Sequence, residues 1–162
     1  MLVNAKENMI CQRRILKEFD DIARDPIPNV KVSCDRSNNN LDWYCMITSL
    51  SDENLVGGEY IFHIKLSPRY PFEPPDFYFL TPNGRFKTQT KLCFSNSSHH
   101  KETWSPIWNL RTIIMGFLSI FLEKGSTGIG HIVSSDEVVK GFAAESKMYN
   151  ETHLQKILTT FK

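Results

Sequence analysis

The stretch YIFHIKL, residues 60–66, carries the clearest pattern in the chain. Every second side chain in it is aromatic or aliphatic, which predicts a β-strand with one face buried. The buried face would carry Tyr60, Phe62, Ile64 and Leu66, and the opposite face Ile61, His63 and Lys65. The pair Gly57-Gly58 just before the strand supplies a flexible turn.

Three further strands are predicted on either side of this stretch. Residues 43–50 and 76–80 show alternation or short aromatic runs bounded by turn residues, and residues 30–34 form a weaker strand. The connections between them are short. The simplest arrangement is therefore a meander of four antiparallel strands.

Helical patterns flank the strands. An apolar stripe on the first helix consists of Ile15, Leu16, Phe19, Ile22 and Ala23. This helix is expected to stop at Asp25-Pro26, because the residue before a proline resists the helical conformation. A strongly apolar helix is predicted over residues 110–121, followed by one opened by a Ser134 and Glu137 capping box and a short one over residues 154–161. Helix, strands and then helices indicate an α+β fold, with residues 1–162 as one domain.

Composition excludes several classes of protein. The chain has 162 residues and 19 Lys plus Arg against 18 Asp plus Glu, a net charge of +1, so nucleic-acid binding through a basic stripe is not expected. The longest nearly apolar run, residues 113–122, is far shorter than the ~20 residues of a membrane span, so no membrane contact by this chain is expected. Its four cysteines form no C-x-x-C pair and no secretory signal is evident, which favours reduced thiols in the cytosol.

Residues 81–109 form a long segment with little periodicity, and such segments commonly carry function. Four strings occur in fixed order in and before it: YPFEPP at 70–75, TPNGRF at 81–86, KLC at 91–93 and TWSPIW at 103–108. Together they resemble the ubiquitin-conjugating enzymes, from about residue 13 to the end. The closer resemblance is to the tail-anchored J-type subgroup of the endoplasmic reticulum, in which TPN followed by GRF replaces the usual HPN.

The resemblance implies that Cys93 accepts ubiquitin as a thioester from an activating enzyme. Thiolate suits this chemistry because it is both a good nucleophile and a good leaving group. Cys93 is also the only cysteine in the long irregular segment. The alternative is a small buried apolar residue, the usual fate of a free cysteine. Cys11, Cys34 and Cys45 are interpreted as structural.

Asn83 is the second predicted catalytic residue. Attack on the thioester builds negative charge on the carbonyl oxygen, and a side-chain amide can stabilise that charge by hydrogen bonding. The alternative is a turn residue in Pro-Asn-Gly, since asparagine tolerates left-handed geometry. Both roles are compatible.

The resemblance also implies a docking surface on the first helix and on two loops. Its predicted residues, which would meet the activating enzyme or a ubiquitin ligase, are Arg13, Arg14, Lys17, Pro71, Phe72, Trp104, Pro106 and Ile107. Exposed aromatic anchors dominate interface energies, which makes Phe72 a hot-spot candidate. The alternatives are core packing of Phe72 and a merely solvated basic helix face.

Three features leave alternatives open. His99 and His100 fit a hydrolase dyad with Cys93, a zinc site, a loop-ordering role or plain solvent exposure. Glu123, just after the central helix, is either the acidic residue that orients the acceptor lysine or a surface residue. The glycine-rich run at 124–130 lacks the order of a phosphate-binding loop, so neither a cofactor nor a metal is expected.

The sequence therefore predicts a ubiquitin-conjugating enzyme whose partners are ubiquitin, an activating enzyme, a ligase and a substrate protein. The resemblance further implies a role in endoplasmic-reticulum-associated degradation. The alternatives are a conjugating enzyme for another ubiquitin-like modifier, a non-catalytic ubiquitin-presenting module and a cysteine hydrolase. The expected location is the cytosol, or the cytosolic face of the endoplasmic reticulum if a membrane anchor follows Lys162.

Overall fold

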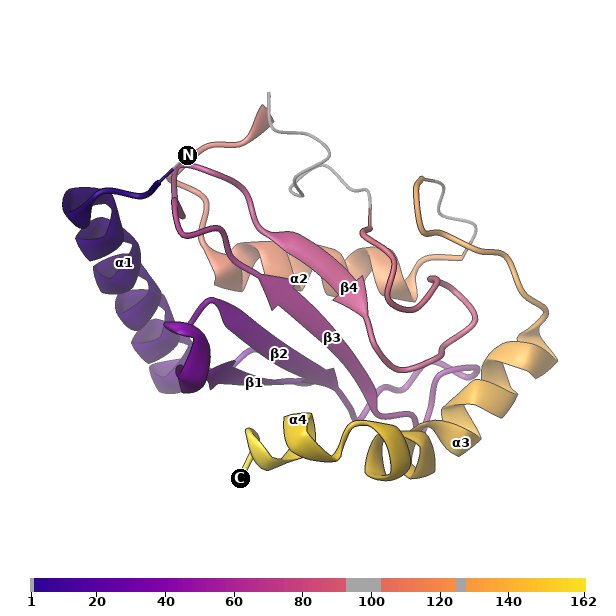
Figure 1. The fold of residues 1–162 in the computed structure, drawn as a ribbon. Helices are drawn as coiled ribbons and strands as arrows, with labels where there is room; N and C mark the ends of the chain where they lie inside the picture. The colour runs from indigo at the N-terminus through magenta and orange to yellow at the C-terminus, as the bar shows by residue number, and fades with distance from the viewer. Residues whose placement is uncertain (1, 93–102, 125–127) are drawn as a thin grey trace.

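The computed structural model describes residues 2–92, 103–124 and 128–162. It confirms an α+β fold with an N-terminal helix, a four-stranded antiparallel sheet and later helices (Figure 1). The elements in chain order are α1 (Ala5–Arg24), β1 (Val30–Asp35), β2 (Asp42–Ile47), β3 (Tyr60–Lys65), β4 (Asp76–Phe79), α2 (Leu110–Leu122), α3 (Asp136–His153) and α4 (Gln155–Thr159), with a 3-10 turn at Arg36–Asn38 between β1 and β2.

The sheet is the predicted meander, with strand order β1-β2-β3-β4 and every neighbouring pair antiparallel. Phe62 in β3 stands opposite Cys45 in β2 and Phe79 in β4. Strand β2 ends at Ile47, three residues earlier than predicted. The reason is a turn beyond it, in which the Thr48 N–H donates to the Asn29 carbonyl and Ser49 has a φ of 58°.

Helix α2 covers one face of the sheet, and aromatic rings fill the space between them (Figure 1). The Phe117 ring of α2 lies 4.7 Å from Phe62 and 5.3 Å from Phe77, measured between ring centroids. Phe121, one turn later, lies 5.1 Å from Phe79. Buried aromatic clusters of this kind contribute a large share of core stability.

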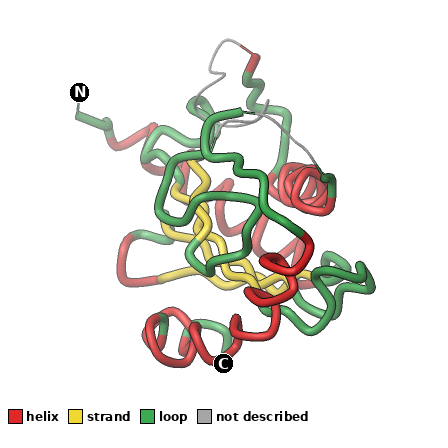
Figure 2. The backbone as a smooth tube through the Cα atoms, turned by 90° about the vertical axis from the view of Figure 1, so that its right-hand side faces the viewer, coloured by secondary structure: helices red, strands yellow, loops and turns green. Residues whose placement is uncertain are grey.

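Helices α3 and α4 lie at one end of the opposite face, so the strands have helices on both sides (Figure 2). The Glu59 N–H donates to Ser146 Oγ of α3, and Ser33 of β1 shares a 2.6 Å hydrogen bond with Thr160 just after α4. This coverage explains why Ile61 is 0 % exposed although it points away from α2. The sequence pattern did not predict burial on this side of β3.

The helix boundaries are mostly those predicted. Helix α1 ends at Arg24 with Asp25 as its C-cap, which confirms the stop before Pro26. Helix α3 begins one residue later than the predicted capping box, because Ser135 Oγ, not that of Ser134, accepts from the Val138 N–H. Within the described residues no helix combines the length and the apolar character needed to cross a bilayer.

Candidate functional site

The TPNGRF segment forms a tight turn that the Asn83 side chain holds together. Asn83 is 1 % exposed; its Oδ1 accepts from the backbone N–H groups of Arg85 and Phe86, both at 2.9 Å, and its Nδ2 donates to the Thr81 carbonyl at 2.9 Å. Gly84 follows with a φ of +82°, where a Cβ would lie 3.1 Å from Val139. Asn83 therefore orders the turn, and its oxyanion role stays a prediction.

Thr81 anchors the same turn to β3 and α3. Its buried hydroxyl accepts from the Ile61 N–H at 2.9 Å and donates to Asn150 Oδ1 at 2.6 Å. Asn150 Nδ2 in turn donates to the Glu59 carbonyl at 2.8 Å. The sequence reasoning missed Asn150, although a signal was present. The buried stripe of α3 has the regular helical spacing Val139, Ala143, Ser146, Asn150, which includes two polar residues.

The chain is also fixed up to the residue before Cys93. The Leu92 N–H donates to the Phe77 carbonyl at 3.0 Å, and the Leu92 side chain is buried. Gly130, with a φ of +89°, packs so closely that a Cβ there would lie 2.5 Å from Leu92 Cδ2. Cys93 itself, like His99 and His100, lies outside the described residues, so the roles predicted for these three stay predictions.

The other three cysteines are poorly suited to nucleophilic chemistry. Burial raises the pKa of Cys11 and of Cys34 to about 11, and that of Cys45 well above its usual value. At neutral pH these groups are thiols, whereas the thiolate is the reactive form. Their environments agree with the structural role predicted for them.

The predicted docking residues divide into exposed and anchored groups. Phe72 is 52 % exposed and Ile107 83 %, and Arg13, Lys17 and Pro106 are exposed as well. Lys17 pairs with Asp21 on its own helix, with 2.7 Å between Nζ and Oδ2. These side chains are available to a partner.

Arg14, Pro71 and Trp104 instead hold the helix and the two loops together. Arg14 Nη2 donates to the Trp108 carbonyl at 2.8 Å, which joins α1 to the second loop. Trp104 Nε1 donates to the carbonyl of buried Pro71 at 2.8 Å, which joins the two loops. Their side chains shape the surface, and a direct partner contact by them stays a prediction.

Glu18, which the sequence reasoning missed, lies beneath this surface and is 4 % exposed. Its carboxylate accepts from the Tyr70 hydroxyl, from Arg14 Nε at 3.2 Å and from the Leu110 N–H at 3.3 Å. Burial raises the pKa of Glu18, and the Tyr70 and Arg14 contacts lower it only in part. The same burial, together with the Glu18 charge, raises the pKa of Tyr70. The sequence did contain a signal for a buried carboxylate, because Glu18 has the same helical spacing as the buried residues Cys11, Ile15 and Ile22.

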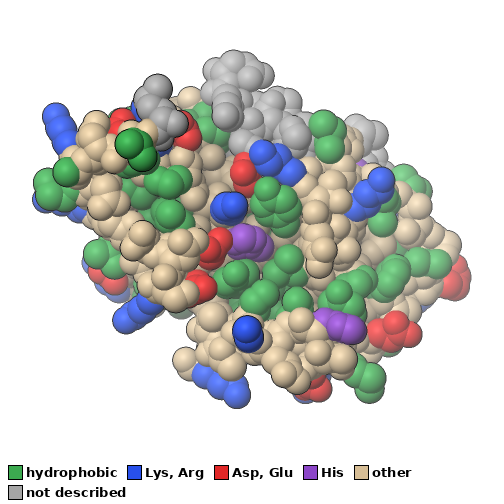
Figure 3. Space-filling model, in the orientation of Figure 1, with side chains coloured by type: hydrophobic (Ala, Val, Ile, Leu, Met, Phe, Trp, Pro, Cys, Tyr) green, Lys and Arg blue, Asp and Glu red, His purple; other side chains and the backbone are tan. Residues whose placement is uncertain are grey.

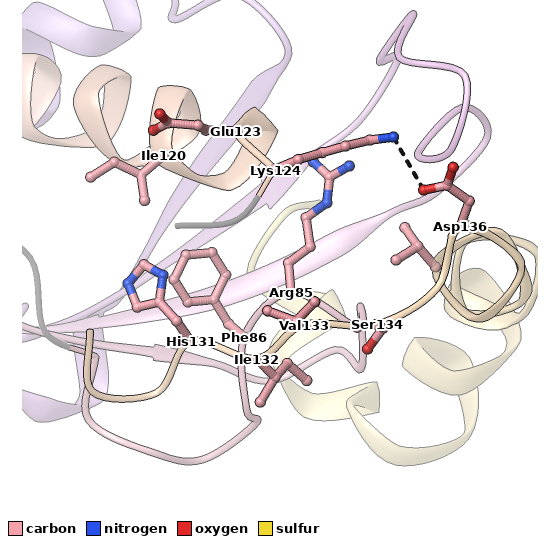
Figure 4. Close-up of a pocket in the computed structure, with 12 residues that line it drawn as sticks. Arg85, Phe86, Ile120, Glu123, Lys124, His131, Ile132, Val133, Ser134 and Asp136 are labelled. Atoms are coloured by element: carbon pink, nitrogen blue, oxygen red, sulfur yellow. Dashed lines mark hydrogen bonds and ion pairs between the residues drawn. The ribbon is translucent and has the colours of Figure 1, made fainter. Parts of the chain in front are cut away.

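A hollow of about 160 Å³ lies between the Asn83 turn, the end of α2 and the start of α3 (Figure 4). Arg85 Nη1 donates to the Phe121 carbonyl at 2.8 Å, and Lys124 pairs with Asp136 at 3.1 Å. Glu123, the C-cap of α2, lines the hollow, and its acceptor-orienting role stays a prediction. Within the described residues no cluster of His, Cys, Asp and Glu suited to a metal is present.

Comparison with known proteins identifies the family. The family model for ubiquitin-conjugating enzymes matches residues 14–153. The chain belongs to the ubiquitin-conjugating enzyme family. It is 37 % identical over 150 residues to ubiquitin-conjugating enzyme E2 6 of Debaryomyces hansenii, covering 93 % of this chain and 61 % of that protein.

Two further relatives come from an animal and an amoeba. Ubiquitin-conjugating enzyme E2 J2 of Mus musculus is 35 % identical over 147 residues, covering 91 % of this chain and 56 % of the relative. The J2-like protein of Dictyostelium discoideum is 36 % identical over 141 residues, covering 87 % and 82 %. The chain thus spans only 56–61 % of the length of the first two of these three relatives.

The ubiquitin-conjugating fold keeps two groups of predicted residues on separate parts of the molecule. Asn83 belongs to the buried turn that shares Thr81 with β3 and α3. Phe72 and Ile107 belong to the exposed loops beside α1. On the face drawn in Figure 3, basic and acidic side chains are interspersed, in keeping with the net charge of +1.

Proposed function

We propose that this domain accepts ubiquitin from an activating enzyme as a thioester on Cys93 and passes it to a substrate lysine with a ligase bound. The observation that carries the proposal is the contrast among the cysteines. Burial keeps Cys11, Cys34 and Cys45 as thiols. Cys93, in contrast, directly follows Leu92 in the sequence, and Leu92 bonds to the Phe77 carbonyl and packs against Gly130. Family membership supports the same assignment.

The chemistry requires two transfers. In the first, Cys93 Sγ attacks the carbonyl carbon of the ubiquitin thioester on the activating enzyme, and the thiolate of that enzyme leaves. In the second, a lysine amine attacks the new thioester and the Cys93 thiolate leaves. Each attack places negative charge on the carbonyl oxygen. Asn83 is the proposed donor to that oxygen, because an amide nitrogen has two hydrogens and the bond to the Thr81 carbonyl uses one.

The proposed partners follow from the exposed surface and from the family. Arg13 and Lys17 of α1, with Phe72, Pro106 and Ile107 of the two loops, are proposed to meet the activating enzyme and the ligase. The resemblance to the J-type subgroup supports a role in endoplasmic-reticulum-associated degradation. Such a role places the protein at the cytosolic face of the endoplasmic reticulum. Fractionation of the full-length product tests this location, and finding the protein only in the cytosol would refute the proposal.

A charging assay tests the central proposal. The purified chain is incubated with activating enzyme, ATP and ubiquitin, and run on a gel with and without thiol. The expected result is a thiol-sensitive adduct that disappears in Cys93→Ala and persists in the matched variant Cys34→Ala. No adduct from the folded wild-type chain would overturn the proposal, and the same assay with other modifiers would then separate a different cargo from a non-catalytic module.

A further inference from the structure

Glu18 is a buried carboxylate whose hydrogen bonds reach three different parts of the chain. Its oxygens accept from Arg14 Nε of α1, from the Tyr70 hydroxyl of the first docking loop, residues 66–75, and from the Leu110 N–H at the start of α2. Burying a carboxylate costs free energy even when it is hydrogen-bonded, and an apolar side chain of similar size often serves stability as well or better. Stability alone therefore does not account for a charge at this position.

The bonds of Glu18 belong to a closed circuit between α1 and both docking loops. Arg14 Nη2 donates to the Trp108 carbonyl of the second docking loop, residues 103–109, at 2.8 Å. Trp104 Nε1 of the same loop donates to the Pro71 carbonyl at 2.8 Å. Pro71 directly follows Tyr70 in the chain, and the Tyr70 hydroxyl returns to Glu18. We call this set the docking network; its members are Arg14, Glu18, Tyr70, Pro71, Trp104 and Trp108.

Contacts between the aromatic rings join the same residues. The Arg14 guanidinium lies 5.9 Å from the centroid of the Tyr70 ring. The Tyr70 and Trp104 centroids are 6.3 Å apart, and those of Trp104 and Trp108 are 5.6 Å apart with the rings nearly perpendicular. Closely packed groups of this kind transmit a displacement from one member to the next. Helix α1 and the two loops are therefore positioned as one unit.

The exposed docking side chains adjoin the docking network in the sequence. Phe72 is the second residue after Tyr70, and Ile107 directly precedes Trp108. On α1, the two exposed basic residues of the predicted docking set each precede a member of the network as well. A surface whose parts are already in place loses less conformational freedom when a partner binds, and this raises affinity.

We propose that Glu18 and Tyr70 are positioning residues for partner binding, an inference that rests on the proposed function. Their hydrogen bond holds the first docking loop against α1 and so sets where Phe72 stands relative to the basic residues of the helix. Glu18 is 4 % exposed and Tyr70 0 %, so both act through the exposed residues and not by touching the partner. Loss of the bond should weaken binding and leave the transfer step unchanged.

Charging kinetics separate binding from transfer. The chain is titrated against ubiquitin-loaded activating enzyme with ATP, and initial rates of thioester formation give KM and kcat. Tyr70→Phe removes only the hydroxyl and keeps the ring beside Arg14 and Trp104. Because hydrogen bonds to charged groups are among the stronger ones, it should raise KM about tenfold and leave kcat within about twofold of wild type.

Tyr60→Phe is the matched control. Tyr60 is also 0 % exposed, and its hydroxyl donates to the Leu55 carbonyl at 3.2 Å. Tyr60 begins β3, whereas the first docking loop follows the end of that strand. The same chemical change at this position should lower the melting temperature but leave KM unchanged.

A double substitution tests whether Tyr70 acts through Phe72. In a Phe72→Ala background the loop no longer carries its apolar anchor, so adding Tyr70→Phe should raise KM by less than about threefold further. Two residues that act independently would instead give the same rise in both backgrounds.

Three results would overturn the inference while leaving the proposed function standing. They are an unchanged KM in the folded Tyr70→Phe chain, an equal rise of KM in Tyr60→Phe, and full additivity with Phe72→Ala. If Tyr70→Phe does not fold, Glu18→Gln decides in its place, because it keeps the shape of the side chain but replaces one acceptor oxygen with a donor. It should show the same rise, and an unchanged KM would overturn the inference. Absence of charging in the wild-type chain would instead count against the proposed function, and the inference would fall with it.

Discussion

The Asn83 turn and the docking loops beside α1 all contain proline, yet they differ in how their side chains are used. In the turn, Asn83 is 1 % exposed and both ends of its amide bond to the backbone. On the docking face, Phe72 and Ile107 present more than half of their surface to solvent. Chemistry requires a fixed geometry, whereas docking requires apolar area that a partner can cover.

The two regions share one device, a buried polar side chain projecting from a helix into the loop. Glu18 of α1 accepts a hydrogen bond from the Tyr70 hydroxyl of the first docking loop. Asn150 of α3 accepts a hydrogen bond from the Thr81 hydroxyl of the turn. Each loop is therefore positioned by a helix that is distant from it in sequence.

The largest expected effect comes from removing the carboxylate under the docking face. Glu18→Ala leaves Arg14 Nε, the Tyr70 hydroxyl and the Leu110 N–H without their acceptor, which should cost about 3–5 kcal/mol in the free energy of unfolding. Urea denaturation measures this. Asp20→Ala, at an exposed position of the same helix, should change it by less than about 0.5 kcal/mol. A loss below about 1 kcal/mol for Glu18→Ala would mean that the docking face does not depend on its buried carboxylate.

The second substitution acts on the turn. Asn83→Ala should slow discharge to lysine by about 10²- to 10³-fold, or ~3 kcal/mol, and slow charging less. Rates of thioester formation and loss are measured separately, with the melting temperature as a check on folding. Equal slowing of both steps would assign Asn83 to turn structure alone, the role its hydrogen bonds already fill.

Truncation on the docking face should separate binding from stability. Phe72→Ala should weaken ligase-stimulated discharge by about 30-fold, equivalent to about 2 kcal/mol, while its unfolding free energy changes little. Met148→Ala, an exposed apolar residue of α3, is the control and should leave ligase stimulation intact. A large fall in melting temperature for Phe72→Ala would show that this ring serves the core.

The smallest expected effect is a pH dependence beneath the docking face. Because burial raises the pKa of Glu18, the folded chain holds this proton more tightly than the unfolded chain. The resulting stability is fully present below the unfolded value of 4.5 and is lost as the pH rises through the folded value. Melting temperatures of wild type and Glu18→Gln should therefore diverge with rising pH in favour of the glutamine variant. Parallel curves would contradict the burial argument.

Most of the fold could be predicted because its signals are local. Alternation in β3 and the apolar spacing of α2 each lie within one element, and Asp25-Pro26 ends α1 through the geometry of a single peptide. The boundary of α3 was wrong by one residue because two adjacent serines offer equivalent caps.

The site was harder to predict because its supports are distant in sequence. Glu18 and Tyr70 are 52 residues apart, and Thr81 and Asn150 are 69 apart. No local pattern pairs such residues, so the bond from Arg14 to the Trp108 carbonyl could not be predicted from the sequence.

The polar residue in each apolar helix stripe also restricts how that helix can be seated. A purely apolar stripe could slide by one turn, about 5.4 Å, and still bury hydrophobic surface. With Asn150 in the stripe, such a slip would separate its amide from Thr81 and from the Glu59 carbonyl and leave buried polar groups unpaired. Helix α3 consequently has one preferred position along its axis. That position in turn fixes the Asn83 turn, because Asn150 bonds to Thr81 at the start of the turn.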